Sequence, residues 1–305
     1  MNWLNNLRIA LIGFCMGVAD LIPGVSGGTV AFVCGIYDRL IEAIKCFDVS
    51  LLRQVLGGRF KEAWARVPVV FLVSLGAGLL TAIFTLSKVL AALFKSHPVE
   101  LWSFFFGLIL GSIVLLTVET WKWRPKDAVA FVVATIATYW LVGLDAVQTP
   151  ATPLYLFVAG FIAISAMILP GISGSYLLVI MGKYQQVLDA VNSRDIASLA
   201  IFVAGIVAGI LSLVRIVSWL LRKWRQTTLV ALTGIMAGAL RTVWPWKEVL
   251  TTRLNSHGEV VPVTQRNILP ADPREIAVAL VLLAVGAVVV LGLSRLNPGK
   301  TEKSA

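Results

Sequence analysis

Residues 23–27 read Pro-Gly-Val-Ser-Gly, and residues 170–174 repeat the pattern as Pro-Gly-Ile-Ser-Gly. Each copy interrupts an otherwise apolar stretch of the chain, and proline and glycine are the residues that most readily end a helix. Helix breaks at corresponding places in two halves of a membrane protein point to a transporter binding site. The fold and the function of the chain are therefore predicted from this pair of motifs.

The similarity between the two halves extends beyond the motifs. Further identities appear when 13–40 is aligned without gaps to 160–187. These pairs are Gly13 with Gly160, Phe14 with Phe161, Ala19 with Ala166, Gly35 with Gly182 and Tyr37 with Tyr184. The sequence therefore predicts a tandem duplication, with a first repeat over 1–147 and a second repeat over 148–305.

The composition is that of a membrane protein. Of the 305 residues, 58% are hydrophobic and only 14% are charged, whereas soluble proteins carry about 25% charged residues. Several nearly uncharged runs approach or exceed the roughly 20 apolar residues that a helix needs to cross a bilayer. The predicted spans are 67–94, 101–119, 128–146, 197–221, 226–244 and 276–294. The sequence thus predicts an all-α polytopic membrane protein.

Each motif lies within a predicted helical hairpin, 4–45 in the first repeat and 153–188 in the second. The incoming arm of the first hairpin has about 13 apolar residues, or ~20 Å of helix, which is short of the ~30 Å hydrocarbon core. We therefore expect re-entrant hairpins, although a hairpin that crosses twice would give the same outer topology. Because three spans follow each hairpin, the second repeat is predicted to be inverted relative to the first.

Lysine and arginine are concentrated in the segments that this topology places on one side of the membrane. The stretch 48–66 belongs to that side, and its mixture of basic and apolar residues predicts a helix lying in the membrane interface. The stretch 245–275 is predicted to be a long polar loop on the other side. By the positive-inside rule both termini are cytoplasmic. The same distribution accounts for the net charge of +10 and argues against nucleic-acid binding.

The two motifs form the predicted substrate site. A helix that begins at Ser26 or Ser173 has free N–H groups and a positive dipole end, which together favour an anion such as phosphate. The candidate binding residues are Ser26, Gly27, Gly28 and Thr29 in the first motif and Ser173, Gly174, Ser175 and Tyr176 in the second. The helix-breaking residues are Pro23, Gly24, Pro170 and Gly171. The alternative is a tight turn with a serine cap and no ligand.

Ionisable residues inside the apolar segments are the next candidates. Asp20 lies three residues before the first proline, where a carboxylate could carry a proton or hold a cation, or could serve only as a structural partner. Arg39, Lys183 and Arg215 are candidates for attracting a phosphate headgroup. Arg215 and Arg241 also lie near the ends of spans, where basic side chains commonly reach out to the membrane interface.

No metal site or cofactor is predicted. Cys15, Cys34 and Cys46 do not have the spacing of metal ligands or a redox pair, and His97 and His257 lie in predicted loops. Gly-x-x-x-Gly pairs at 107/111, 205/209 and 234/238 indicate close helix packing, either within one chain or in a homodimer. Membrane lipids are the other partners that we expect.

The two motifs with their flanking residues resemble the bacterial polyprenyl-phosphate transporter family. The residues that carry the resemblance are 20–29, 35–37, 169–175 and 182–184. The resemblance implies an inner-membrane transporter, not an enzyme. It would return undecaprenyl phosphate, a lipid carrier of envelope-polymer synthesis, from the outer to the inner leaflet. Paired helix ends suit a phosphate headgroup, and the isoprenoid tail could remain in the lipid while the head crosses between the repeats.

Two other functions fit parts of the pattern. The first motif is also similar to the Pro-Gly-x-Ser-Arg-Ser motif of membrane polyprenyl-pyrophosphate phosphatases, but Gly27 and Gly174 stand where that motif has arginine. The paired glutamates expected beside it are missing as well. A transporter or channel for a small ion or soluble anion would use the same helix ends. An apolar lateral opening between the halves would favour a lipid, and a closed polar pore would favour the small ion.

Overall fold

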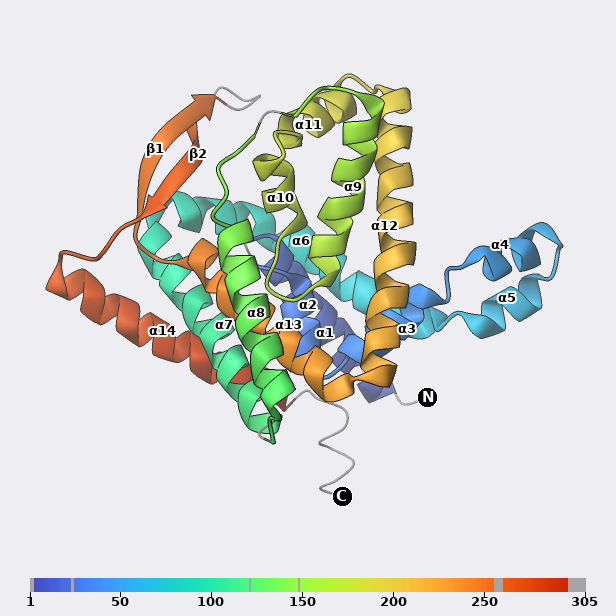
Figure 1. The fold of residues 1–305 in the computed structure, drawn as a ribbon, viewed down its shortest axis with the longest axis horizontal. Coiled ribbons are helices and arrows are strands. Elements are labelled where there is room, and N and C mark those ends of the chain that lie inside the picture. The colour runs from blue at the N-terminus through green and yellow to red at the C-terminus, as the bar shows by residue number, and fades with distance from the viewer. Residues whose placement is uncertain (1–2, 23–24, 121, 148, 255–259, 296–305) are drawn as a thin grey trace.

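A computed structural model describes residues 3–22, 25–120, 122–147, 149–254 and 260–295 (Figure 1). The protein is mostly helical. The helices of the first half are α1 Trp3–Asp20, α2 Gly27–Val33, α3 Tyr37–Lys45, α4 Val49–Leu56, α5 Phe60–Arg66, α6 Val69–Ser96, α7 Pro98–Glu119 and α8 Pro125–Leu141. The second half contains α9 Pro153–Ile168, α10 Gly174–Ile180, α11 Tyr184–Asn192, α12 Ile196–Lys223, α13 Arg225–Ala239, the 3₁₀ turn η1 Leu240–Val243, β1 Lys247–Leu254, β2 Val260–Asn267 and α14 Pro273–Ser294.

Four helices are long and apolar enough to cross a bilayer: α6, α7, α12 and α14. Large apolar side chains on their surfaces, such as Phe84, Val114 and Leu280, remain exposed to the surroundings of the protein. Side chains of this kind are stable in such positions when lipid rather than water covers them. The prediction of a helical membrane protein is therefore confirmed.

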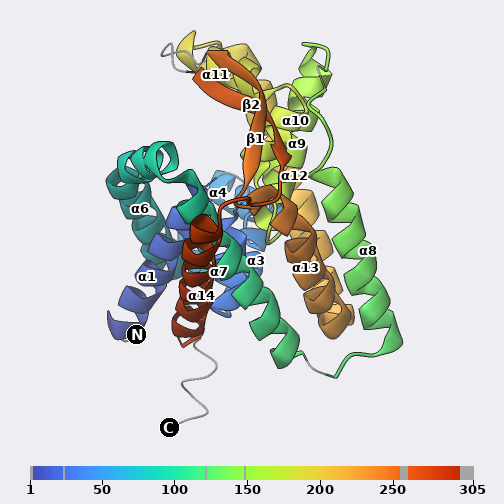
Figure 2. The same cartoon turned by 90° about the vertical axis from the view of Figure 1, so that its left-hand side faces the viewer.

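The helices pack in pairs that correspond between the two halves. Helix α1 lies against α6 and α9 lies against α12, so each hairpin's incoming helix packs on the long helix that follows the hairpin. The other two pairs exchange partners between halves, because α7 packs against α14 and α8 against α13. In Figures 1 and 2, α1 begins at the lower edge of the molecule, whereas α9 begins at the upper edge.

Glycines make these close contacts possible. A side chain on Gly78 would overlap the backbone of Ala10 in α1, and a side chain on Gly205 would overlap the backbone of Phe157 in α9. The three Gly-x-x-x-Gly pairs likewise all face helices of the same chain. Close packing within the chain is thus one use of these motifs, and a homodimer stays a prediction.

The prediction of an all-α fold is wrong between α13 and α14. Strands β1 and β2 form an antiparallel hairpin in which Lys247 pairs with Asn267 and Thr252 pairs with Pro262. The hairpin stands on the upper side of the molecule (Figure 2). Valine and threonine recur through both strands, and β-branched residues favour extended backbone. The polar composition that predicted a loop did not reveal this local preference.

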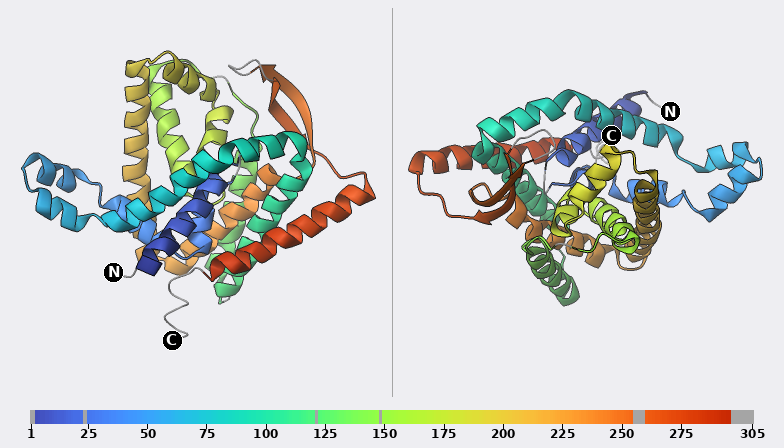
Figure 3. Two further views of the ribbon diagram at one scale, coloured as in Figure 1. Left: turned by 180° about the vertical axis from the view of Figure 1, so that it is seen from behind. Right: turned by 90° about the horizontal axis from the view of Figure 1, so that it is seen from above.

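The prediction of one continuous helix over 48–66 is also wrong, while the location of this stretch in the membrane interface stays a prediction. Two short helices, α4 and α5, occupy this stretch and form an arm that extends away from the other helices (Figure 3). Gly57 and Gly58 separate them, and Gly58 has a φ of +71°. Glycine adopts this left-handed conformation without a steric penalty, and it ends α4.

Three further helix lengths differ from the prediction. Helix α1 has 18 residues, more than the ~13 counted from the sequence, because it already begins at Trp3, four residues before Leu7. Helices α8 and α13 stop at Leu141 and Ala239, short of the predicted ends of spans 128–146 and 226–244. Both early ends lie beside the second motif.

Candidate functional site

The structure brings the two sequence motifs into direct contact. The Ser26 hydroxyl donates a hydrogen bond to the carbonyl oxygen of Met167 at 3.0 Å, and the amide of Gly171 donates to Thr29 Oγ1 at 2.9 Å. The Tyr37 hydroxyl reaches the carbonyl oxygen of Ile168 at 3.3 Å. The first motif and the helix behind it therefore hold the end of α9, where the second break begins.

The first motif is closed around its own residues. Ser26 caps α2, with its Oγ accepting from the Gly28 amide at 3.1 Å, and Asp20 Oδ1 accepts from the Gly27 amide at 2.7 Å. Ser26, Gly27, Gly28 and Thr29 are all buried. The Asp20 carboxylate thus already occupies the place that an external anion would take at this helix end. Pro23 and Gly24, the predicted helix breakers of this motif, lie outside the described residues.

The second motif has a different arrangement. Ser173 precedes α10 but makes no side-chain cap, because its hydroxyl pairs with that of Ser175 at 2.9 Å. Ser175 is exposed, whereas Gly174 and the helix-breaking Pro170 are buried. The first turn of α10 therefore keeps the free amides that every helix start leaves without an internal partner.

Gly171 fixes the position of the second motif against α13. Its φ is +94°, a conformation that side-chain-bearing residues rarely adopt. A Cβ atom at this position would lie 2.9 Å from the Cα of Met236 and 3.3 Å from the Cβ of Ala239. The break therefore requires glycine both for its backbone conformation and for its close approach to the end of α13.

The basic residues singled out in the sequence lie in three different environments. Lys183 is buried, and its ammonium group donates to the carbonyl oxygens of Thr149 and Pro150 at 3.2 and 2.7 Å and to a Gln186 side-chain oxygen at 2.8 Å. An ammonium group has three N–H donors, so these bonds use all of them. Lys183 thereby anchors the segment that precedes α9.

The other two predicted basic residues are exposed. Arg39 stacks over the ring of Phe71 at 4.3 Å, in a cation–π contact with α6. Arg215 lies on the exposed surface of α12. Neither residue shares a hydrogen bond with the described residues of the two motifs.

Arg241, which was expected only to reach toward the interface, lies beside the second motif. It follows Ala239, the residue that Gly171 faces. Its guanidinium donates to the carbonyl oxygen of Tyr139 at 3.1 Å and lies 4.6 Å from the centre of the Tyr139 ring. One feature of the sequence could have indicated this position. Arg241 lies one turn after Gly238, directly after the helix α13 that packs against Gly171.

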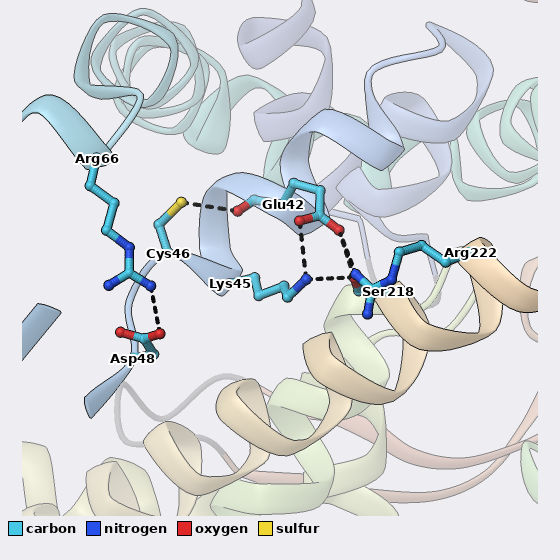
Figure 4. Close-up of polar contacts among 7 residues, drawn as sticks. All are labelled: Glu42, Lys45, Cys46, Asp48, Arg66, Ser218 and Arg222. Carbon is cyan, nitrogen blue, oxygen red and sulfur yellow. Dashed lines mark hydrogen bonds and ion pairs between the residues drawn. The ribbon is translucent and has the colours of Figure 1, made fainter. Parts of the chain in front are cut away.

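A network of charged and hydroxyl groups joins the two halves away from the motifs (Figure 4). Glu42 on α3 accepts from the Ser218 hydroxyl at 2.5 Å and pairs with Arg222 at 3.5 Å, both on α12. Lys45 pairs with Glu42 at 3.3 Å and donates to Ser218 Oγ at 3.1 Å. We call Glu42, Lys45, Ser218 and Arg222 the α3–α12 clasp. At the start of α13, Arg225 pairs with Asp38 of α3 at 2.6 Å.

Over the described residues, no group of three or more histidine, cysteine, aspartate or glutamate side chains is placed to hold a metal ion. The chemistry available at the two motifs consists of hydroxyls, backbone amides, one carboxylate and one guanidinium. Such an arrangement is suited to binding an anion and to changing its own hydrogen bonds when the anion arrives.

Comparison with known proteins places this arrangement in a family. A family model described as undecaprenyl phosphate translocase-like matches residues 16–261, which include both motifs. A polyprenyl-phosphate transporter of Vibrio cholerae is 42% identical over 303 residues, covering 96% of this chain and 97% of the relative. A polyprenyl-phosphate transporter of Staphylococcus aureus is 30% identical over 261 residues, covering 80% and 86%. No solved structure gives a significant match.

Proposed function

We propose that this chain, which belongs to the undecaprenyl phosphate translocase-like family, moves undecaprenyl phosphate from the outer to the inner leaflet of the bacterial cytoplasmic membrane. Two relatives, which cover 96% and 80% of this chain, are polyprenyl-phosphate transporters by name. The observation that carries the proposal is the direct contact between two broken-helix motifs inside a membrane-spanning bundle. The substrate returned in this way would serve again as a lipid carrier.

We further propose that the chain consists of two inverted repeats, 1–147 and 148–305, each with a re-entrant hairpin. The corresponding helix pairs α1–α6 and α9–α12 support this organisation, as do the opposite edges at which α1 and α9 begin. Inverted repeats supply two related conformations, which is the requirement for alternating access. The distribution of basic residues along the chain supports a cytoplasmic location of both termini.

The headgroup is proposed to bind where the motifs meet. Ser175 is exposed and its hydroxyl pairs with that of the buried Ser173, whereas the first motif must give up the Asp20 contact to Gly27 before it can bind an anion. Protonation of Asp20 would weaken that contact and couple transport to a proton. Lys183 supports the loop before α9 rather than the headgroup, because its donors are already bonded.

The α3–α12 clasp is proposed to close the cytoplasmic side in this conformation. It joins the outgoing arm of the first hairpin to the last turns of α12, and the Asp38–Arg225 pair adds a second link at the start of α13. The pairs are largely exposed, and such pairs contribute only about 0–1 kcal/mol each. A closure of this strength can break and re-form in every transport cycle.

The test is leaflet exchange of labelled undecaprenyl phosphate in proteoliposomes. We expect exchange faster than in empty liposomes, and its loss in the Ser26→Ala/Ser173→Ala double variant. Ser193→Ala is the matched control, since Ser193 is exposed and bonds only within its own turn.

Two results would contradict the proposal. No exchange above empty liposomes, with and without a pH or sodium gradient, would exclude lipid translocation and favour a soluble anion. Phosphate release from a polyprenyl pyrophosphate would instead indicate a phosphatase.

A further inference from the structure

Arg241 lies where three elements converge on the second motif. It belongs to η1, which continues α13 directly after the residue that faces Gly171. Its guanidinium reaches the end of α8 through the carbonyl oxygen and ring of Tyr139. Tyr176, in the first turn of α10, reaches the same end of α8, where its hydroxyl donates to the Val142 carbonyl oxygen at 2.6 Å. Arg241 is therefore brought next to α10 by the fold itself.

The charge of Arg241 is not neutralised by a carboxylate. Among the described residues Arg241 forms no ion pair, and one bond to a carbonyl leaves most of its five N–H donors unused. Tyr176 lies within electrostatic range of both Arg241 and Asp145, so Arg241 is close to the first turn of α10. A guanidinium that forms no ion pair with the described residues, and that reaches the same end of α8 as Tyr176 in the first turn of α10, has the chemistry of a phosphate-binding group.

We infer that Arg241 binds the phosphate headgroup of the lipid, together with the hydroxyls of Ser173 and Ser175. This inference rests on the proposed function. It identifies Arg241 as the positively charged group that would neutralise the phosphate. The planar guanidinium can hold two phosphate oxygens at once, which an ammonium cannot do in the same geometry.

The other basic residues near the bundle interior do not fill this role. Lys183 uses its donors on backbone and amide oxygens, and Arg222 and Arg225 pair with carboxylates of α3. Arg215 is the matched alternative, because it is an arginine exposed on a helix of the same half. Arg215→Gln is therefore the control for Arg241→Gln.

Gly143 provides a second way to move the guanidinium without removing it. A Cβ atom at Gly143 would overlap the guanidinium of Arg241. Because the overlapping atoms are the far end of a flexible side chain, Gly143→Ala should displace Arg241 and leave the backbone in place. Arg241→Gln removes the charge, whereas Gly143→Ala retains the charge and changes its position, so the two effects can be measured separately.

The experiment measures binding of undecaprenyl phosphate and of uncharged undecaprenol to purified protein in nanodiscs. We expect Arg241→Gln to weaken phosphate binding by about 10- to 100-fold, the usual loss for a hydrogen-bonded charge, and to leave undecaprenol binding unchanged. Gly143→Ala should weaken phosphate binding in the same direction, Arg241→Lys should retain part of it, and Arg215→Gln should behave as wild type.

Exchange of the lipid in proteoliposomes distinguishes a failure of the Arg241 assignment from a failure of the proposed translocase function. If the wild type exchanges undecaprenyl phosphate but Arg241→Gln binds and exchanges it equally well, the assignment of Arg241 is wrong and the translocase function stands. Equal losses of phosphate and alcohol binding would also overturn it, since they would show a purely structural role. If the wild type itself neither binds nor exchanges the lipid, the proposed function fails.

Discussion

The two motifs share a sequence pattern but differ in their surroundings. In the first, Asp20 accepts from the Gly27 amide and Ser26 caps the helix, so the helix start is buried and satisfied. The residue that corresponds to Asp20 in the second repeat is Met167, which has no carboxylate, and Ser173 forms no cap. The difference teaches that motifs with the same sequence pattern can be satisfied differently, here through the Asp20 carboxylate in the first and through the Ser173–Ser175 pair in the second.

The two motifs therefore have different structural roles. The first motif holds the second in place through Ser26 and Thr29, whereas the second leaves Ser175 exposed. One of the two broken helices can thus serve mainly as a support for the other. The predictions that follow test how far the two motifs differ.

The largest effect is expected for Gly171→Ala, which would break the contact that positions the second motif. The left-handed φ and the overlap with the α13 backbone should together destabilise the protein by roughly 2–4 kcal/mol. The measurement is the thermal unfolding midpoint in detergent. Gly76→Ala is the control, because no atom lies near a Cβ placed there. An unchanged midpoint in Gly171→Ala would show that the break does not depend on this packing.

Serine substitutions should distinguish the motifs. Ser26→Ala removes a helix cap and leaves the Met167 carbonyl without this donor, a loss of about 0.5–2 kcal/mol. Ser173→Ala removes only a contact between two hydroxyls, so its unfolding midpoint should stay close to that of the wild type. Equal destabilisation by both variants would contradict the view that only the first motif is structurally closed.

Asp20→Asn tests whether the closed motif responds to protons. The amide oxygen can still accept from Gly27, so folding should be nearly preserved, but the group can no longer gain or lose a proton. We expect leaflet exchange in this variant to be slower and independent of pH, whereas exchange by the wild type should vary with pH. Full wild-type exchange in Asp20→Asn would eliminate the coupling role.

The smallest effect concerns Lys247 on β1, which donates to the Thr242 carbonyl oxygen next to Arg241 and lies 3.8 Å from the centre of the Trp102 ring. Burial lowers the pKa of Lys247 to about 7, whereas in the unfolded chain it stays near 10.4. Between these values the unfolded chain binds the additional proton, so the free energy of unfolding should rise from pH 7 to pH 10.

Lys247→Met should abolish that rise. The measurement compares the unfolding midpoints of the wild type and the variant at pH 7 and pH 9. Because water reaches the half-buried Lys247 side chain, the difference should be much smaller than the ~4 kcal/mol that a pKa of about 7 would imply for a fully enclosed group. Parallel pH dependences in the two proteins would show that Lys247 is not held in a low-dielectric environment.

Much of the architecture was predictable because it depends on local composition. Long apolar runs predict the spanning helices α6, α7, α12 and α14, since lipid leaves few alternatives to a helix. The hairpin of β1 and β2 was not predicted, because its polar sequence is typical of a loop. Its β-branched residues stabilise strands only when the two strands pair with each other. Glycines at 57 and 58 were visible in the sequence, but their effect on α4 and α5 depends on the backbone conformation.

The contact between the two motifs was predictable from their repetition, the groups packed around them were not, and their role as the headgroup site stays a proposal. Repetition of the motif pointed to Ser26 and Ser173, and the structure brings the two motifs together. The closing contact of Asp20 and the place of Arg241 depend on which helices pack against each motif. Such tertiary neighbours have no signature in the spacing of residues along the chain.

The most direct measurement is photo-crosslinking with an undecaprenyl phosphate that carries a photoreactive group next to the phosphate. The labelled residues are then identified by mass spectrometry in the protein reconstituted in lipid. The account predicts adducts within 170–176 and around Arg241, which compete with unlabelled undecaprenyl phosphate and disappear in Arg241→Gln. Adducts confined to the α4–α5 arm or the outer faces of α6 and α14 would contradict a headgroup site between the two motifs.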